Sequence, residues 1–174
     1  MKRVLLPLLA LGLPVALAQT TPAAQPAPQP VQLAATRTVT QVSLSLSAAV
    51  RIAQLAVQNC AQGGYNVTAT VVDRAGITLA VAPAENAGPH TLDASYRKAY
   101  TRASARNTTA AIAENIRTNP TSAELARIDR FLVLAGGMPI RVDNVVVGAA
   151  GVGGASGTID EKCVTDAITT VLGR

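Results

Sequence analysis

The single histidine of this chain, His90, limits the catalytic chemistry that its residues can carry. A Ser-His-Asp or Cys-His arrangement would have to use it, and no Gly-x-Ser-x-Gly motif is present to supply a nucleophile. A structural zinc site needs four histidine or cysteine ligands, and His90 with Cys60 and Cys163 supplies too few. The carboxylates show no spacing typical of general acid–base catalysis. The residue types therefore favour ligand binding over classical catalysis.

His90 can nevertheless act as a ligand, because neutral imidazole binds haem iron and other transition metals. It stands just before a predicted helix whose basic residues are Arg97, Lys98, Arg102 and Arg106. Such residues usually form a solvated face, but Lys98 or Arg102 would be able to pair with a ligand's carboxylates. The alternative for His90 is a solvated loop residue without a ligand. Spacing alone leaves both interpretations open.

A glycine-rich run covers residues 148–157, between a predicted strand and a predicted helix. It lacks the G-x-G-x-x-G order of dinucleotide-binding loops, and no alternating βαβ pattern surrounds it. One interpretation is close backbone packing with a sharp turn. The other is a helix N-terminus whose backbone amides receive a carboxylate or propionate.

Two cysteines, Cys60 and Cys163, lie on helices predicted at opposite ends of the domain. A bridge between them is the only internal pairing available, and it would close a loop of roughly a hundred residues. The alternative is a pair of buried free thiols, since cysteine packs well as a small apolar residue. Spacing cannot establish the separation of the two Cα atoms that a disulfide requires.

Hydrophobic periodicity predicts the elements that position these residues. A first helix is predicted from a cap at Ser45 or Ser47 to Gly63–Gly64. Strands are predicted over 67–72, 77–81, 138–142 and 145–152, the last two joined by a turn at Asp143–Asn144. Further helices are predicted from a cap at Thr91, from Thr108 or Thr109 to Ile116, at the capping box of 121–124, and from Thr158 to Leu172.

The order of these elements indicates an α+β fold, in which helices gather on one antiparallel sheet. Thr68 and Thr70 alternate with Val67, Ala69 and Val71. One face of the sheet is therefore expected to be more polar than the other. Residues 38–174 have the size of one ordinary domain.

The N-terminal residues are expected to direct export. A positive start, a short apolar run and Ala16-Leu17-Ala18 together predict a signal peptide over residues 1–18. The apolar run is too short to be a membrane anchor. Residues 19–37 are rich in Pro, Ala and Gln and are expected to be a linker. The predicted location is periplasmic or secreted.

Composition argues against a nucleic-acid partner. The formal net charge is +5, but Lys and Arg form no blocks, and the aromatic residues are three Tyr and one Phe. Proteins that bind single-stranded DNA or RNA combine basic grooves with aromatic side chains on which the bases stack. We therefore expect no nucleic-acid partner, and no membrane span once the signal peptide has been cleaved.

Several segments together resemble the GlcG/HbpS family of haem-binding proteins, in particular its exported members. The resemblance covers about residues 44–172 in the family's order. It is carried by residues 72–76 (VDRAG), 87–95 (AGPHTLDAS), 97–101 (RKAYT), 136–140 (GGMPI), 147–155 (VGAAGVGGA) and 160–163 (DEKC).

This resemblance implies a profilin-like α+β fold, with an antiparallel β-sheet of about five strands flanked by helices. The first and last helices would share one side, which would bring Cys60 and Cys163 within reach of a disulfide. The resemblance also implies homo-oligomers. Ligand residues vary among family members, and the matched motif carries over His90, Lys98 and Thr101 as cofactor-binding positions.

The resulting hypothesis is an exported haem carrier or sensor, in which His90 is the axial ligand of the haem iron. Lys98 would pair with a propionate, and Tyr96, Tyr100 and Met138 would form pocket walls. A corrinoid is the alternative tetrapyrrole. Two other functions stay open: an enzyme that degrades haem or turns over a small organic acid, and an oligomeric module without a cofactor.

Overall fold

The computed structural model of this chain describes residues 31–107 and 109–173. Its contacts divide the chain into two units, 1–39 and 40–174. The predicted signal peptide and residues 19–30 of the predicted linker lie outside the described residues. Residues 31–39 are exposed and contain no helix or strand.

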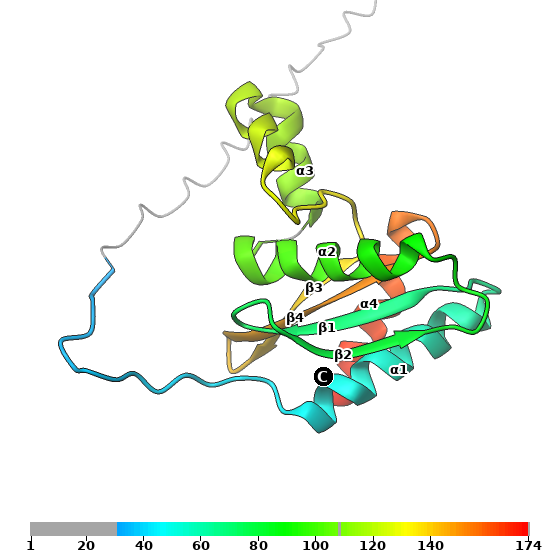
Figure 1. The fold of residues 1–174 in the computed structure, drawn as a ribbon, viewed down its shortest axis with the longest axis horizontal. Helices are drawn as coiled ribbons and strands as arrows, with labels where there is room; N and C mark the ends of the chain where they lie inside the picture. The colour runs from blue at the N-terminus through cyan, green and yellow to red at the C-terminus, as the bar shows by residue number, and fades with distance from the viewer. Residues whose placement is uncertain (1–30, 108, 174) are drawn as a thin grey trace, which may run out of the picture. The chain divides into compact units, whose positions relative to one another are not determined.

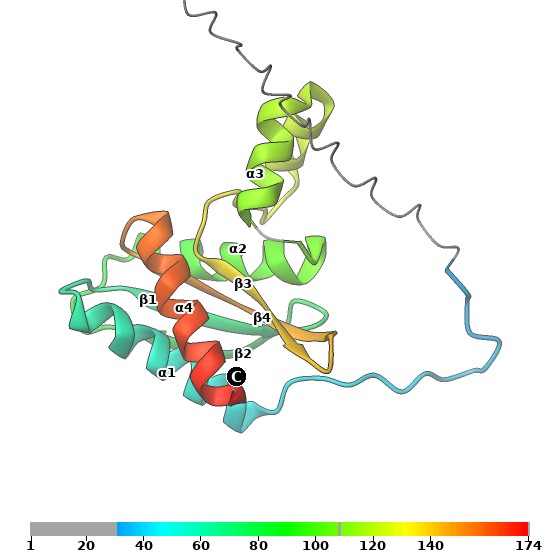
Figure 2. The same ribbon diagram turned by 180° about the vertical axis from the view of Figure 1, so that it is seen from behind.

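The second unit has helices on both faces of one sheet (Figures 1 and 2). The sheet has the strand order β2-β1-β4-β3, with every neighbouring pair antiparallel. The elements are α1 (Leu46–Gln62), β1 (Thr68–Asp73), β2 (Thr78–Pro83), α2 (His90–Ala105), α3 (Thr109–Thr118), the 3-10 helix η1 (Pro120–Arg127), β3 (Gly137–Val142), β4 (Val145–Gly153) and α4 (Gly157–Leu172). The predicted α+β class is confirmed.

The described residues form four strands, where about five were expected. The segment before β3 is irregular, and its backbone bonds to side chains of α2 and, at the Gly136 carbonyl, to the Val152 N–H of β4. The Phe131 carbonyl accepts a hydrogen bond from Arg97 at 2.8 Å, and the Leu132 N–H donates to the Thr101 hydroxyl at 2.9 Å.

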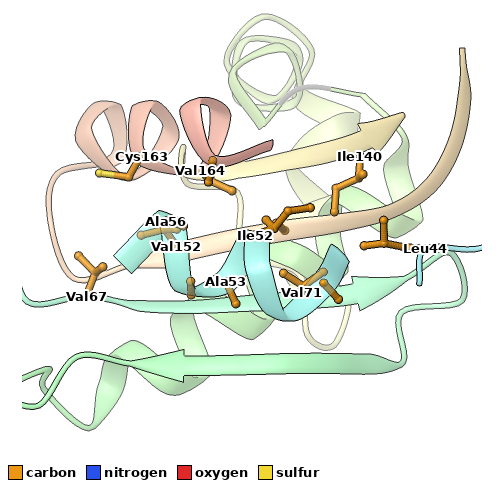
Figure 3. Packing of buried hydrophobic residues seen from close by; sticks show 14 of the residues in the cluster. Leu44, Ile52, Ala53, Ala56, Val67, Val71, Ile140, Val152, Cys163 and Val164 are labelled. Carbon is orange, nitrogen blue, oxygen red and sulfur yellow. The ribbon is translucent and has the colours of Figure 1, made fainter. Parts of the chain in front are cut away.

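Helices α1 and α4 cover one face of the sheet and enclose the main apolar core. Ser45 caps α1 by accepting a hydrogen bond from the Ala48 N–H, and Gly63 ends the helix, as predicted. The core residues come from both helices and from the strands beneath them (Figure 3); those labelled are Leu44, Ile52, Ala53, Ala56, Val67, Val71, Ile140, Val152, Cys163 and Val164.

Helix α2 covers the opposite face, which is the more polar one, as expected. The Thr68 and Thr91 hydroxyls are hydrogen-bonded at 2.7 Å, and those of Thr70 and Ser95 at 2.8 Å. All four side chains are buried, so these bonds satisfy polar groups that would otherwise be costly to remove from water. The predicted cap at Thr91 is wrong, because Pro89 occupies the cap position and Thr91 contacts β1 instead.

Glycines of β4 allow α2 to lie unusually close to the sheet. A Cβ placed on Gly151 would stand 2.6 Å from the Ala99 nitrogen and 3.0 Å from the Lys98 Cβ. A Cβ on Gly153 would stand 3.1 Å from that of Ala94. The packing interpretation of the glycine-rich run therefore holds for residues 148–153, which form strand and not a loop.

Replacing Gly151 with alanine should lower the free energy of unfolding by about 2–3 kcal/mol, because α2 must move away from β4. Gly173→Ala is the matched control: nothing lies within 4 Å of its added Cβ. Its left-handed backbone should then limit the loss to about 1 kcal/mol. Urea denaturation of both variants measures the difference, and equal losses would contradict close packing at Gly151.

Between α2 and β3 the chain makes a helical excursion formed by α3 and η1, which stands away from the sheet (Figures 1 and 2). Helix α3 begins at Thr109, as predicted. The 3-10 helix η1 follows a cap at Asn119, two residues before the predicted cap Thr121. The chain leaves α2 through Arg106 in the left-handed region, with φ 53°.

Two further local predictions can be compared with the structure. The turn at Asp143–Asn144 has φ angles of 47° and 63°, which confirms the predicted hairpin. The predicted cap of α4 at Thr158 is wrong, because Ser156 is the cap residue.

None of the helices in the described ranges has the length and apolar character that crossing a membrane requires.

Candidate functional site

His90 is the first residue of α2, and its side chain is exposed. Its ring lies against Gly88, where an added Cβ would stand 2.9 Å from the His90 Cε1 and 3.0 Å from Nδ1. Gly88 therefore leaves the space that the imidazole occupies. Within the described residues no hydrogen bond or ion pair engages the ring nitrogens, so they are available to a metal or a ligand.

An aromatic cluster lies further along α2, where Tyr96 also packs against buried residues between the helix and the sheet. It consists of Tyr96, Tyr100 and Phe131, with ring centroids 5.9 Å apart for the two tyrosines and 6.4 Å for Tyr100 and Phe131. The Arg130 guanidinium stands 5.9 Å from the Tyr100 centroid, within the range of a cation–π contact. The cluster is partly exposed and gathers three of the four aromatic residues in the chain.

Arg97 lies between His90 and this cluster. Residues 90, 93, 97 and 100 are three or four positions apart, so they share one face of the helix. The Arg97 side chain is 35% exposed, and its Nη1 is 3.6 Å from the Asp93 carboxylate. Its Nη2 donates to the Phe131 carbonyl, while its Nε has no partner among the described residues. We call His90, Arg97 and the aromatic cluster the outer face of α2.

Lys98 points the other way, into the protein. Its Nζ donates to Asp160 Oδ2 at 2.8 Å and to the Val152 carbonyl at 2.9 Å. The Asp160 carboxylate also accepts a hydrogen bond from the Ala155 N–H at 3.1 Å. Burial raises the pKa of Asp160, although Lys98 and Ala155 act in the opposite direction. The ammonium group of Lys98 is therefore engaged inside the fold.

Thr101 and Met138 are also separated from the outer face. The buried Thr101 hydroxyl donates to the Arg97 carbonyl at 2.8 Å and accepts from the Leu132 N–H. Met138 lies on β3, with its sulfur 3.9 Å from Arg102 Nη2. His90, Tyr96 and Tyr100 are thus exposed or half-buried on α2, with the tyrosines six and ten positions after His90 along the helix, while Lys98, Thr101 and Met138 are placed elsewhere.

Arg102 is a second cation beneath α2 and is fully buried. Its Nε donates to the Gly137 carbonyl, and its Nη1 has no hydrogen-bond partner within the described residues. Burial lowers the pKa of Arg102 to about 10, with Glu161 acting in the opposite direction. The guanidinium therefore stays charged at neutral pH and is not available to a ligand at the surface.

Sequence reasoning missed Arg97 and Phe131 as members of this face, and Arg130 as the cation beside Tyr100. Their signal was available only in part: the three- and four-residue spacing from His90 to Tyr100 predicts one helix face. Arg130 and Phe131 come from the segment that returns after η1, and no spacing rule connects them to α2.

The described residues contain no group of three or more His, Cys, Asp or Glu side chains that could hold a metal ion.

The two cysteines form a disulfide between α1 and α4, with an S–S distance of 2.17 Å and Cα atoms 5.5 Å apart. It borders a groove of about 530 Å³ between the end of α1 and the start of α4. We call this the α1–α4 groove. Its lining residues are Asn59, Cys60, Gln62, Gly63, Tyr65, Thr158, Ile159, Lys162, Cys163 and Asp166.

Comparison with known proteins identifies relatives across most of the chain. The family model described as "Haem degrading protein HbpS-like" matches residues 44–169. The crystal structure of a double mutant of HbpS from Streptomyces reticuli is 35% identical, with a TM-score of 0.73, and the match covers 86% of this chain and 100% of that one.

Two more distant proteins are also similar. An uncharacterised 15.0 kDa protein from the dhaT-dhaS intergenic region of Citrobacter freundii is 29% identical over 121 residues, 68% of this chain and 84% of that protein. A PduOC:heme complex has the same fold at 20% identity and a TM-score of 0.66, over 74% of this chain and 94% of that chain.

Proposed function

Because this chain belongs to the HbpS-like family, we propose that it binds haem on the outer face of α2 and serves as an exported carrier or sensor. The observation that carries the proposal is the position of its only histidine. His90 is exposed on the same helix face as Arg97 and the aromatic cluster. An imidazole can ligate the haem iron, a cation can pair with its carboxylates, and an aromatic surface can contact its ring.

Each group on this face has a separate role in the proposal. His90 would ligate the haem iron, since no hydrogen bond or ion pair engages its ring nitrogens within the described residues. Arg97 replaces Lys98 as the propionate partner, because Lys98 already pairs with Asp160. Tyr96 and Tyr100 provide apolar surface for the ring, which is consistent with their predicted role as walls.

The remaining parts of the proposal rest on the sequence. Export rests on the signal-peptide pattern of residues 1–18 and gives a periplasmic or secreted location. A homo-oligomer would cover haem that one exposed helix face leaves in contact with water. Haem is proposed ahead of a corrinoid because the family description names haem.

Haemin added to the purified protein should produce a Soret band that His90→Ala shifts, with an affinity lower by about tenfold or more. Arg97→Gln should weaken binding while leaving the ligand spectrum unchanged, because it removes the propionate contact, together with the bond to the Phe131 carbonyl, but leaves His90 in place. Gln58→Ala, an exposed change on α1, is the control. Parallel titration with cobalamin distinguishes the two tetrapyrroles.

Identical spectra for the wild type and His90→Ala would exclude His90 as the axial ligand even if haemin still binds. Absence of any spectral or thermal response to haemin would remove the proposal altogether, because a ligand that binds only the folded state raises its melting temperature. That result would favour the oligomeric module without a cofactor.

The family description favours one second candidate, haem degradation. Ring opening consumes O₂ and electrons from a reductant and releases the iron. With ascorbate present, an enzyme should bleach the Soret band and release iron to a chelator faster than free haemin does. A carrier should instead slow both processes, because the bound haem is shielded.

A further inference from the structure

The Cys60–Cys163 disulfide lies at the border of the α1–α4 groove and not at the centre of the core. Both cysteines line the groove, and Figure 3 shows Cys163 at the end of the apolar cluster away from Leu44 and Ile140. Cys60 is 1% exposed and Cys163 is 5% exposed. Of the two residues, Cys163 is the slightly more exposed, and both line the groove.

The groove has the size and lining of a site for a small amphipathic molecule. A volume of about 530 Å³ falls within the ~300–1,000 Å³ typical of small-molecule pockets. Its floor contains the disulfide and Ile159, while Asn59, Lys162 and Asp166 provide polar groups around it. Mixed polar and apolar lining suits a compact amphipathic ligand.

The charge of Lys162 favours a thiolate in this groove. Lys162 is adjacent to Cys163 in sequence, and its side chain is 75% exposed and paired with Asp166 at 2.6 Å. A nearby ammonium group lowers the pKa of a thiol and stabilises an attacking thiolate.

The wall on the α1 side is formed by Tyr65 and the glycines that end the helix. Tyr65 is 38% exposed, and its ring covers Gly63, where an added Cβ would stand 3.0 Å from the Tyr65 Cε2. The turn that carries Cys60 ends at Gly63 and Gly64, and Gly64 has φ +82° with open space around it. The Cys60 carbonyl accepts hydrogen bonds from the Gly63 and Tyr65 N–H groups at 3.0 and 3.1 Å, so uncovering Cys60 requires this turn to open.

We propose that the α1–α4 groove is a site at which a low-molecular-weight thiol reduces the Cys60–Cys163 disulfide in the folded protein. The thiolate attacks the Cys163 sulfur and forms a mixed disulfide, and the Cys60 sulfur leaves with the bonding electron pair and takes up a proton. A second thiol molecule then attacks the mixed disulfide. The products are two protein thiols and one oxidised disulfide of the small thiol.

Reduction of the disulfide would also remove one of the links among the helices that cover the sheet. Cys163 lies one helical turn after Asp160, and Asp160 pairs with Lys98 of α2. The disulfide and this ion pair together connect α1, α4 and α2. This inference does not depend on haem binding, so its test is independent of the test of the proposed function.

The test is the rate at which the native protein is reduced by 2-mercaptoethanesulfonate, followed by alkylation and mass spectrometry. The rate should be proportional to thiol concentration and unaffected by urea below the unfolding transition. Lys162→Gln should slow this anionic thiol about two- to fivefold by removing a nearby positive charge, and should not slow cysteamine, whose ammonium is attracted to Asp166.

Arg127→Gln is the matched control, because it removes the same charge from the exposed helix η1, where the guanidinium is paired with Glu124. It should leave both rates unchanged. Tyr65→Ala should accelerate reduction by both thiols, because it uncovers Gly63 and the end of α1.

Two results would overturn the proposal. The first is a reduction rate that increases with urea in parallel with global unfolding, which would show that thiols react only with the unfolded chain. The second is an equal effect of Lys162→Gln and Arg127→Gln on both thiols. Circular dichroism of each variant establishes that it is folded under the assay conditions.

Discussion

Replacing Cys60 and Cys163 together with alanine should lower the free energy of unfolding by about 4–5 kcal/mol. The bond joins residues 103 positions apart, so its loss frees a long loop in the unfolded chain. It also connects the two helices that enclose the main core. Urea denaturation of the oxidised wild type and of the double variant measures the effect.

The fully reduced wild type is the control that separates the cross-link from packing. It keeps both sulfur atoms in the core, so it should lose nearly as much stability as the double variant. A loss below about 1 kcal/mol in the reduced protein would mean that the unfolded chain is already compact enough to make the cross-link unimportant.

Replacing Lys98 with methionine should lower the free energy of unfolding by about 3–5 kcal/mol, because it leaves the Asp160 carboxylate buried without its partner. The double variant Lys98→Met/Asp160→Leu should regain most of this loss, since two apolar side chains remove the desolvation penalty as well as the pair. Lys162→Met is the matched control. It breaks an exposed pair with Asp166 and should cost only about 0.5 kcal/mol.

The Lys98→Met effect should depend on pH in a defined direction. Burial raises the pKa of Asp160 above 3.8 in the folded protein, so the folded state keeps this proton at pH values where the unfolded chain has released it. Stability from this group is complete below the unfolded pKa and falls as pH rises through the folded value. Loss of Lys98 raises the folded pKa further.

The destabilisation by Lys98→Met should therefore be smaller at about pH 4 than at about pH 7, because a protonated Asp160 needs no cation. Denaturation of both proteins at the two pH values checks this. A pH-independent difference would mean that Lys98 acts through the packing of its methylene groups and its bond to Val152, and not through the charge of Asp160.

The ends of elements were predictable where local chemistry decides them. Ser45 and Gly63 bound α1 because a hydroxyl cap and a glycine end satisfy the helix termini whatever lies elsewhere. Asp143 and Asn144 form the turn between β3 and β4 because both residues tolerate positive φ. Thr68 and Thr70 could be assigned to one sheet face from their alternation alone.

The site was less predictable because α2 carries charged residues on both sides. Lys98 and Arg102 are buried, while His90 and Asp93 are exposed, so periodicity did not show which side meets the sheet. The buried partner of Lys98 lies 62 residues away, on α4. Only the placement of α2 and α4 around the start of β3 brings these charges together, and no spacing rule describes that.

The excursion formed by α3 and η1 offers a place to attach a reporter. Its departure at Arg106 and its return at Phe131 are held independently, since Arg97 and Thr101 bond the returning segment to α2. Asn119, between α3 and η1, is exposed. A fluorescent domain inserted there would leave the anchoring bonds intact, and exposed connections of this kind tolerate insertion well.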